Sequence, residues 1–277
     1  MKELIIKAIF LLCNVLMIVF SISCIFPILW LINSSFKSGQ EFSQSILALP
    51  QNINFDNYKA VLASGKMVTY FTNSLIISSL SVLFVVLLAF VTSYCIARIE
   101  FRGKGLVYGL YLSGMLVPLH GLLVPLFILF QKTGLYDKRL TLLLPYIAIG
   151  LPTAIFLMSS FIKSLPKELE EAALIDGCNV HQVLFSIIFP LCKPVVSTVV
   201  ILSFLTLWNE FPFALILISN DQFKTISVGL SNFTGMYSVN YPQLMTSLVL
   251  ASMPVIIVYL LFYKKIIQGM VAGAVKG

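Results

Sequence analysis

The chain has 277 residues, of which 59% are hydrophobic and 10% are charged, and its formal net charge is +7. Soluble domains carry about 25% charged residues, so a chain this poor in charge cannot cover its surface in water and belongs in a bilayer. Its basic residues fall in short connectors and do not alternate with aromatic residues, which argues against nucleic acid as a partner. Cationic connectors instead orient a membrane protein towards the anionic cytoplasmic face.

Hydrophobic segments predict how the chain crosses the membrane. The first apolar run is longer than the ~7–15 residues of a signal peptide, so we expect it to be a retained span. A crossing helix needs roughly 20 apolar residues, and lipid requires every backbone group to be bonded within the segment. The predicted fold is an all-α integral membrane protein, a single domain over 1–277, with six transmembrane helices at about 8–31, 72–97, 106–130, 141–162, 194–218 and 244–263.

His120 is the notable polar residue of the third predicted span. It lies between Pro118 and Pro125, which predict a kink in that helix. Two interpretations stay open: a neutral histidine buried against a neighbouring helix, or a histidine that lines a pore.

The loop at 166–190, PKELEEAALIDGCNVHQVLFSIIFP, is the polar interruption of the chain. Pro166 and the glutamates suit the first turn of a helix, where the helix dipole favours negative charge. Asp176-Gly177 ends that helix, because glycine escapes the roughly 1–2 kcal/mol cost of the left-handed conformation. A second apolar stripe then runs to Pro190. The pattern alone fits either an amphipathic connector on the membrane surface or a docking helix for a cytoplasmic partner.

Asn209-Glu210 lies about 16 residues, or ~24 Å, into the fifth predicted span. A carboxylate in a bilayer is costly and usually faces a water-filled cavity or a partner. With Trp208 and Phe211 beside it, the group offers hydrogen bonds and a flat apolar surface, which suit a sugar. An interhelical gate or a packing hydrogen bond is the alternative.

Motifs for catalysis are absent from the sequence. GxxxxGK[ST], GxSxG and HExxH do not occur, and the two histidines lie on different elements. The five cysteines show neither CxxC nor Cys/His spacing. We therefore expect a non-catalytic chain with no metal site and no cofactor of its own.

The loop resembles the Glu-Ala-Ala loop of binding-protein-dependent ABC importer permeases. The family pattern is filled by Glu171, Ala172, Ala173, Asp176, Gly177, Ile188 and Pro190. FRGKG at 101–105, LTLWNEF at 205–211 and GMVAGAVKG at 269–277 further resemble the carbohydrate-uptake branch, especially the maltose-type second permease subunit.

This resemblance implies a type I ABC importer permease fold with a cytoplasmic coupling loop at 163–193 and a cytoplasmic tail at 264–277. ATP and Mg would be bound by two separate ATP-binding subunits. The other implied partners are a sister permease subunit, an extracytoplasmic solute-binding protein, a sugar substrate and membrane lipid. The implied location is the bacterial cytoplasmic (inner) membrane, with both termini in the cytoplasm. The predicted ATPase-docking residues are Glu170, Glu171, Ala172, Ala173, Asp176, Gly177 and Val180.

Two further sets of site residues are predicted. An ATPase-interface tail comprises Ala272, Gly273, Val275, Lys276 and Gly277, for which a plain unstructured end is the alternative. A translocation path comprises His120, Trp208, Asn209, Glu210 and Phe211. The alternative functions are a permease for glycerol phosphate or an amino acid, and a secondary transporter, which usually buries several ionisable groups.

Overall fold

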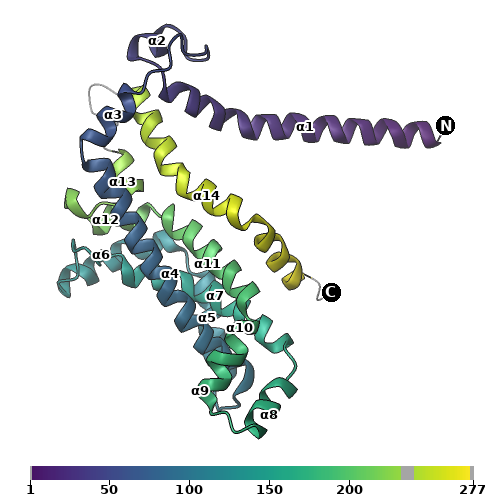
Figure 1. Cartoon of the computed structure of the whole chain (residues 1–277). Helices are drawn as coiled ribbons and strands as arrows, with labels where there is room; N and C mark the ends of the chain where they lie inside the picture. The colour runs from purple at the N-terminus through teal and green to yellow at the C-terminus, as the bar shows by residue number, and fades with distance from the viewer. Residues whose placement is uncertain (1, 232–239, 275–277) are drawn as a thin grey trace. The chain divides into compact units, whose positions relative to one another are not determined.

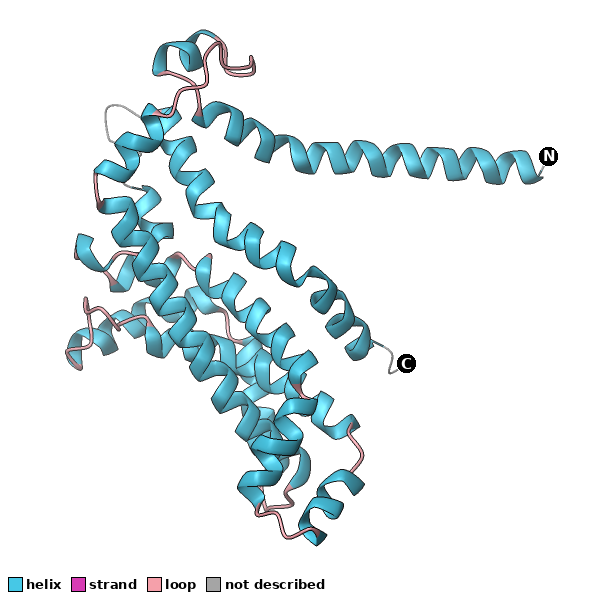
Figure 2. Cartoon of the chain, in the orientation of Figure 1, coloured by secondary structure: helices cyan, strands magenta, loops and turns pink. Residues whose placement is uncertain are grey.

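The computed structural model of the chain describes residues 2–231 and 240–274, and the regular elements of these two ranges are helices (Figures 1 and 2). The chain divides into two units, each described here by itself. The first unit comprises Met1–Val68 and Leu230–Met253, and the second comprises Thr69–Gly229 and Pro254–Gly277. The single domain over 1–277 stays a prediction. Of the predicted tail, Val275, Lys276 and Gly277 lie outside the described residues.

The first unit is built around the C-terminal end of the long helix α1 (Lys2–Ser35). It also contains α2 (Gly39–Gln44), α3 (Asp56–Ala63) and the first part of α14 (Tyr241–Ala274). A capping box starts α2, because the Ser38 hydroxyl accepts the Glu41 N–H while the Glu41 carboxylate accepts the Ser38 N–H. The Thr246 hydroxyl of α14 donates to the Ser35 carbonyl at 3.2 Å, which joins α14 to the end of α1.

The second unit contains most of α4 and all the helices from α5 to the start of α13. Their bounds are α4 (Lys66–Arg98), α5 (Lys104–Ser113), η1 (Gly114–Leu116), η2 (Leu119–Leu122), α6 (Leu123–Lys132), α7 (Leu143–Ser164), α8 (Glu168–Ile175), α9 (Val180–Gln182), the π-helix η3 (Val183–Ile188), α10 (Phe189–Leu191), α11 (Lys193–Trp208), α12 (Pro212–Leu217), η4 (Asp221–Phe223) and α13 (Ile226–Ser231).

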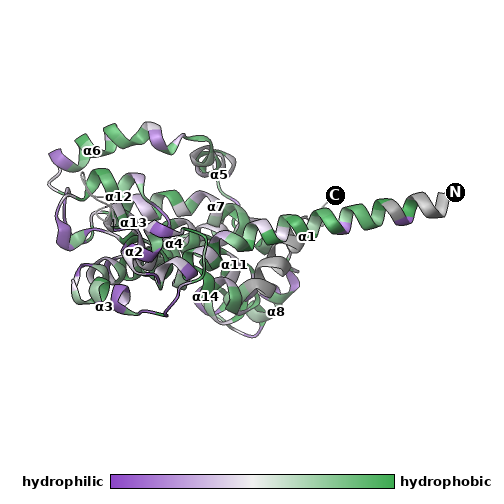
Figure 3. Cartoon of the chain, turned by 90° about the horizontal axis from the view of Figure 1, so that it is seen from above, coloured by the Kyte–Doolittle hydropathy of each residue, from purple (hydrophilic) through white to green (hydrophobic). Residues whose placement is uncertain are grey.

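Within the described ranges, four helices are long and apolar enough to cross a membrane, and up to six spans result if each of two bent helix pairs counts as one. The four are Ile9–Ser35, Lys66–Arg98, Leu143–Ser164 and Tyr241–Phe262. They overlap the predicted first, second, fourth and sixth spans. Figure 3 shows the apolar character along α1.

The third predicted span, 106–130, is a bent pair. Lys104–Leu116 and Leu119–Lys132 meet at 95°. The cause is Pro118, because the residue before a proline is driven out of the helical region, and Val117 has the extended ψ of 122°. The predicted kink is therefore present, and it is much sharper than a kink within one helix.

The prediction of one continuous helix over 194–218 for the fifth span is wrong. Helix α11 ends at Trp208, and a separate helix α12 begins at Pro212. A proline has no N–H for the helical ladder and its ring clashes with the preceding turn, so the helix ends before it. At its other end α11 meets Val180–Leu191 at an angle of 74°.

The core of the second unit lies where α4 and α7 meet. A Cβ added to Gly150 would lie 2.7 Å from a methyl carbon of Val85, so the glycine permits this close approach. The Ser93 hydroxyl of α4 donates to the Ile155 carbonyl of α7 at 3.2 Å, and both residues are fully buried. Helix α4 thus packs against α7 in the core, and its last residue, Arg98, contacts the loop at 166–190.

Candidate functional site

The first candidate site is the helix and glycine elbow of the loop, which lie at one end of the second unit (Figure 1). Helix α8 carries its glutamates in the first turn and ends with Asp176 as its C-cap. Gly177 then adopts the left-handed conformation with a φ of 83°. Its N–H donates to the Leu174 carbonyl at 3.1 Å, and the Cys178 N–H donates to the Ala173 carbonyl at 3.0 Å. The predicted helix and its glycine stop are confirmed.

A second capping box starts the other arm of the elbow. The Asn179 side chain accepts the Gln182 N–H at 2.9 Å, and the Gln182 side chain accepts the Asn179 N–H at 2.8 Å. The chain then continues through a π-helical turn, where Val183, Leu184 and Ile188 are buried. This box was not predicted, although a polar residue three positions before glutamine is its usual signal in a sequence.

An ion pair ties the first arm to α4. Arg98 Nε donates to Glu170 Oε1 at 2.6 Å, and Arg98 Nη2 donates to the Leu165 carbonyl at 2.8 Å. The Tyr94 hydroxyl donates to Glu170 Oε2 at 3.2 Å. The Arg98 and Glu170 side chains are only 7% and 12% exposed. No local pattern in the sequence predicts this contact, because Arg98 and Glu170 lie far apart in the chain.

The predicted docking residues therefore lie on two faces of the loop. Glu170 and Ala173 face the rest of the second unit. Glu170 forms the ion pair with Arg98, and Ala173 is buried. The others are exposed: Glu171, Ala172, Asp176, Gly177 and Val180. Beside them Leu174 and Ile175 are exposed as well, and Ile175 is 85% exposed at the tip of the helix.

The second candidate site is the break between α11 and α12. Glu210 Oε1 accepts the Phe213 N–H at 2.7 Å, while Oε2 accepts the Ala214 N–H at 3.1 Å and the Tyr146 hydroxyl at 2.8 Å. The carboxylate thus satisfies the first N–H groups of α12 and joins them to α7. This geometry matches the interhelical hydrogen bond that the sequence left open as an alternative.

The remaining residues of the predicted path are spread around that break. Trp208 is buried, with the Phe204 ring stacked on it at a centroid distance of 5.6 Å and the Phe71 ring in an edge-to-face contact at 5.5 Å. Asn209 and Phe211 are exposed. His120 is also exposed, on η2 within the bend of the third span, so its interpretation as a buried histidine is wrong for this chain.

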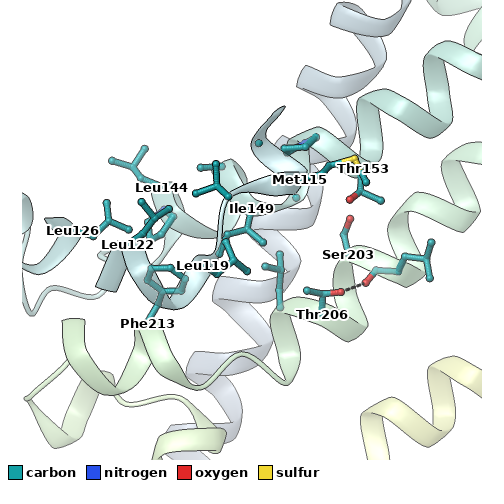
Figure 4. A pocket seen from close by; sticks show the side chains of 18 of the residues that line it. Met115, Leu119, Leu122, Leu126, Leu144, Ile149, Thr153, Ser203, Thr206 and Phe213 are labelled. Atoms are coloured by element: carbon teal, nitrogen blue, oxygen red, sulfur yellow. Dashed lines mark hydrogen bonds between the residues drawn. The ribbon is translucent and has the colours of Figure 1, made fainter. Parts of the chain in front are cut away.

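A cavity of about 590 Å³ opens beside the bend, between η1, η2, α6, α7, α11 and α12 (Figure 4). Its walls are mostly aliphatic, and Leu119, Leu122, Leu126 and Leu144 lie on one side. The hydroxyl-bearing residues Thr153, Ser203 and Thr206 lie together on the other side. The five predicted path residues are not among the described residues that line it. No local pattern in the sequence predicts this cavity, because its walls come from helices that meet only when the chain folds.

Comparison with known proteins identifies the class. Residues 86–271 match the family described as "binding-protein-dependent transport system inner membrane component". This match covers more than half of the chain, and the chain belongs to that family, whose members are importer permeases of the inner membrane.

Individual relatives cover nearly the whole chain. The chain is 38% identical over 252 residues to a putative ABC transporter permease protein, ORF2, of Caldicellulosiruptor sp. (strain Rt8B.4), covering 91% of each. It is 34% identical to the trehalose/maltose transport system permease protein MalG of Thermococcus litoralis, over 100% of both chains. It is also 34% identical to the diacetylchitobiose uptake system permease protein NgcG of Streptomyces coelicolor, over 91% of this chain and 84% of the relative.

A solved structure shares the fold. A chain in the crystal structure of a bacterial ABC transporter that imports the acidic polysaccharide alginate superposes with a TM-score of 0.84 at 24% identity. The match covers 93% of this chain and 96% of that chain. At this identity the likeness establishes the importer permease fold alone.

Proposed function

We propose that this chain is one permease subunit of an ATP-driven sugar importer and that it is coupled to a separate ATPase through the loop at 166–190. The observation that carries the proposal is a helix-glycine elbow in a chain of this family, with one face held to α4 by an ion pair and the other exposed. The loop lies in the cytoplasm in this proposal, as do both termini.

In the proposed mechanism, the loop acts as a lever between the ATPase and the membrane helices. Its first arm is fixed to α4 by the Arg98–Glu170 pair, and its second arm continues through η3 and α10 into α11. Helix α11 ends at the break that Glu210 joins to α7. A push on the exposed face is therefore transmitted to helices that border both the break and the cavity.

The predicted docking residues take two roles in this mechanism. Glu171, Ala172, Asp176 and Val180 contact the ATPase, together with the exposed Ile175. Glu170 and Ala173 hold the base of the lever, and Gly177 sets the angle of the elbow.

A sugar is the proposed substrate because relatives that cover most of this chain are named for trehalose, maltose and diacetylchitobiose uptake. A secondary transporter is less well supported. Both oxygens of Glu210 already accept hydrogen bonds, which makes this carboxylate a poor proton carrier.

The proposed assembly has several further parts. A sister permease completes the translocation path, an extracytoplasmic solute-binding protein delivers the sugar, and two ATP-binding subunits hold ATP and Mg. This chain then has no catalytic residue of its own. Its C-terminal tail, including Ala272 and Gly273, reaches the ATPase interface.

Uptake by the intact complex tests this proposal. The complex that copurifies with this chain is reconstituted into proteoliposomes with its binding protein, and labelled trehalose, maltose or diacetylchitobiose is supplied. We expect uptake of at least one sugar to require ATP on the side of the loop and to resist competition by amino acids. Uptake driven by an ion gradient without ATP would contradict the importer assignment, and competition by amino acids would contradict the sugar.

A further inference from the structure

We propose that residues 45–55, here named the fold-back loop, insert into the bilayer interface beside the end of α1 and bind lipid there. The loop belongs to the first unit and lies next to the C-terminal end of α1 (Figure 2). The proposal concerns the depth of this loop in the membrane, so it does not depend on which sugar is transported.

Side chains from the end of α1 hold the backbone of the loop. Trp30 Nε1 donates to the Ile46 carbonyl at 3.0 Å, and Asn33 Nδ2 donates to the Ala48 carbonyl at 3.0 Å. Both donors lie before the last residue of α1, Ser35. The loop therefore turns back and runs alongside the final turns of the helix.

The depth of these turns follows from the length of the span. The apolar part of α1, Ile9–Ser35, has 27 residues, which gives a helix of about 40 Å at 1.5 Å per residue. The hydrocarbon core is only about 30 Å thick, so each end of this stretch extends about 5 Å beyond the core. Trp30 then lies close to the boundary between hydrocarbon and headgroups, where tryptophan is enriched. The carbonyl of Ile46 is held at the same depth.

The exposed side chains of the loop suit that depth. Leu47 and Leu49 are 70% and 82% exposed, and Ile46, Ile53 and Phe55 are exposed as well. The sequence between Glu41 and Asp56 contains no charged residue. Apolar side chains in a water-facing loop would be unfavourable, whereas the interface accepts apolar surface to a depth of about 5–10 Å.

The two charged residues that precede the loop, Lys37 and Glu41, are hydrogen-bonded to backbone groups. Lys37 is 1% exposed, and its ammonium donates to the Ser45 carbonyl at 3.0 Å and to the Ile46 carbonyl at 2.9 Å. Glu41 accepts the N–H groups of Ser38 and Gln51. These contacts satisfy backbone groups that would be costly to expose to lipid.

The composition of the surface also distinguishes lipid from a protein partner. The centres of protein interfaces are enriched in Tyr, Trp, Phe, Met and Arg. The exposed surface of the fold-back loop is mostly Ile and Leu and carries no arginine. Bound in this way, the loop anchors the first unit at the bilayer surface.

Photocrosslinking identifies what covers the loop. The photoreactive residue p-benzoylphenylalanine replaces Leu47 or Leu49, and the complete importer is purified in phospholipid nanodiscs with its binding protein present. Lys59 of the same unit is the matched control position, because its side chain is 77% exposed and pairs with Asp56 in water. Illuminated samples are analysed by mass spectrometry for adducts on this chain.

We expect phospholipid adducts at Leu47 and Leu49 in at least tenfold higher yield than at Lys59. Adducts to the solute-binding protein or to the sister permease in place of lipid would overturn the proposal. Lipid yields equal to that of the control position would overturn it too. Each of these results leaves the ATP-driven uptake of the complex untouched, so the lipid site and the transport function are tested separately.

Discussion

Replacing Arg98 with alanine is expected to give the largest loss of stability among single substitutions in the loop region. The Arg98→Ala variant leaves the Glu170 carboxylate nearly buried, with the Tyr94 hydroxyl as its remaining side-chain donor. Removal of one partner of a buried ion pair costs about 3–5 kcal/mol, because the other charge stays desolvated. Thermal unfolding in detergent checks this, with labelling of the fully buried Cys192 thiol as the signal.

A neighbouring ion pair provides the matched control. Lys104 pairs with Glu100 at 2.8 Å, but the Glu100 side chain is 87% exposed. The hydrogen bond from Lys104 holds the pKa of Glu100 below its usual value. Solvent screens an exposed pair, which contributes little to stability, so Lys104→Ala is expected to unfold near the wild-type temperature. Equal midpoints for Arg98→Ala and Lys104→Ala would show that Arg98 does not anchor the loop.

Replacing Gly177 with valine is expected to separate ATP hydrolysis from sugar uptake. An L-residue in the left-handed conformation costs roughly 1–2 kcal/mol, and β-branched residues tolerate it least. No atom of the described chain lies within 4 Å of a Cβ built on Gly177, so the strain comes from the backbone alone. The Gly177→Val variant should assemble with the ATPase while the elbow opens. Sugar uptake and ATP hydrolysis are measured together in proteoliposomes, and the sugar moved per ATP should fall several-fold.

Asparagine at the same position is the control, because it adopts the left-handed conformation more readily than other residues with a side chain. Gly177→Asn should retain most of the coupling ratio. A Gly177→Val complex that moves as much sugar per ATP as the wild type would contradict the role of the elbow.

The elements that depend on local pattern were predictable from the sequence. Apolar runs located the first, second, fourth and sixth spans, and the order of acids, glycine and proline located both arms of the loop. These features depend on residues that are neighbours in the chain. The same reasoning placed the kink near His120, since Pro118 acts on the residue directly before it.

The features that depend on distant residues were not predictable. No local signal joins Arg98 to Glu170 or Glu210 to Tyr146, since each pair forms only when two helices pack. Trp208 illustrates the same limit. Its sequence neighbours suggested an open sugar-binding surface, whereas the side chain is buried and contacts Phe71 of another helix. The prediction of a continuous fifth span was wrong for a local reason. It followed the apolar run through Pro212, although a proline breaks a helix.

In the proposed mechanism, the exposed face of α8 contacts a cytoplasmic ATPase. Photocrosslinking from Ile175, the most exposed apolar residue of that face, tests it directly in the complete complex in native membranes. We predict one dominant adduct, to the ATP-binding subunit, with a yield that changes when ATP is added. An adduct to the solute-binding protein, or labelling of this position from the extracytoplasmic side of sealed vesicles, would contradict the claim.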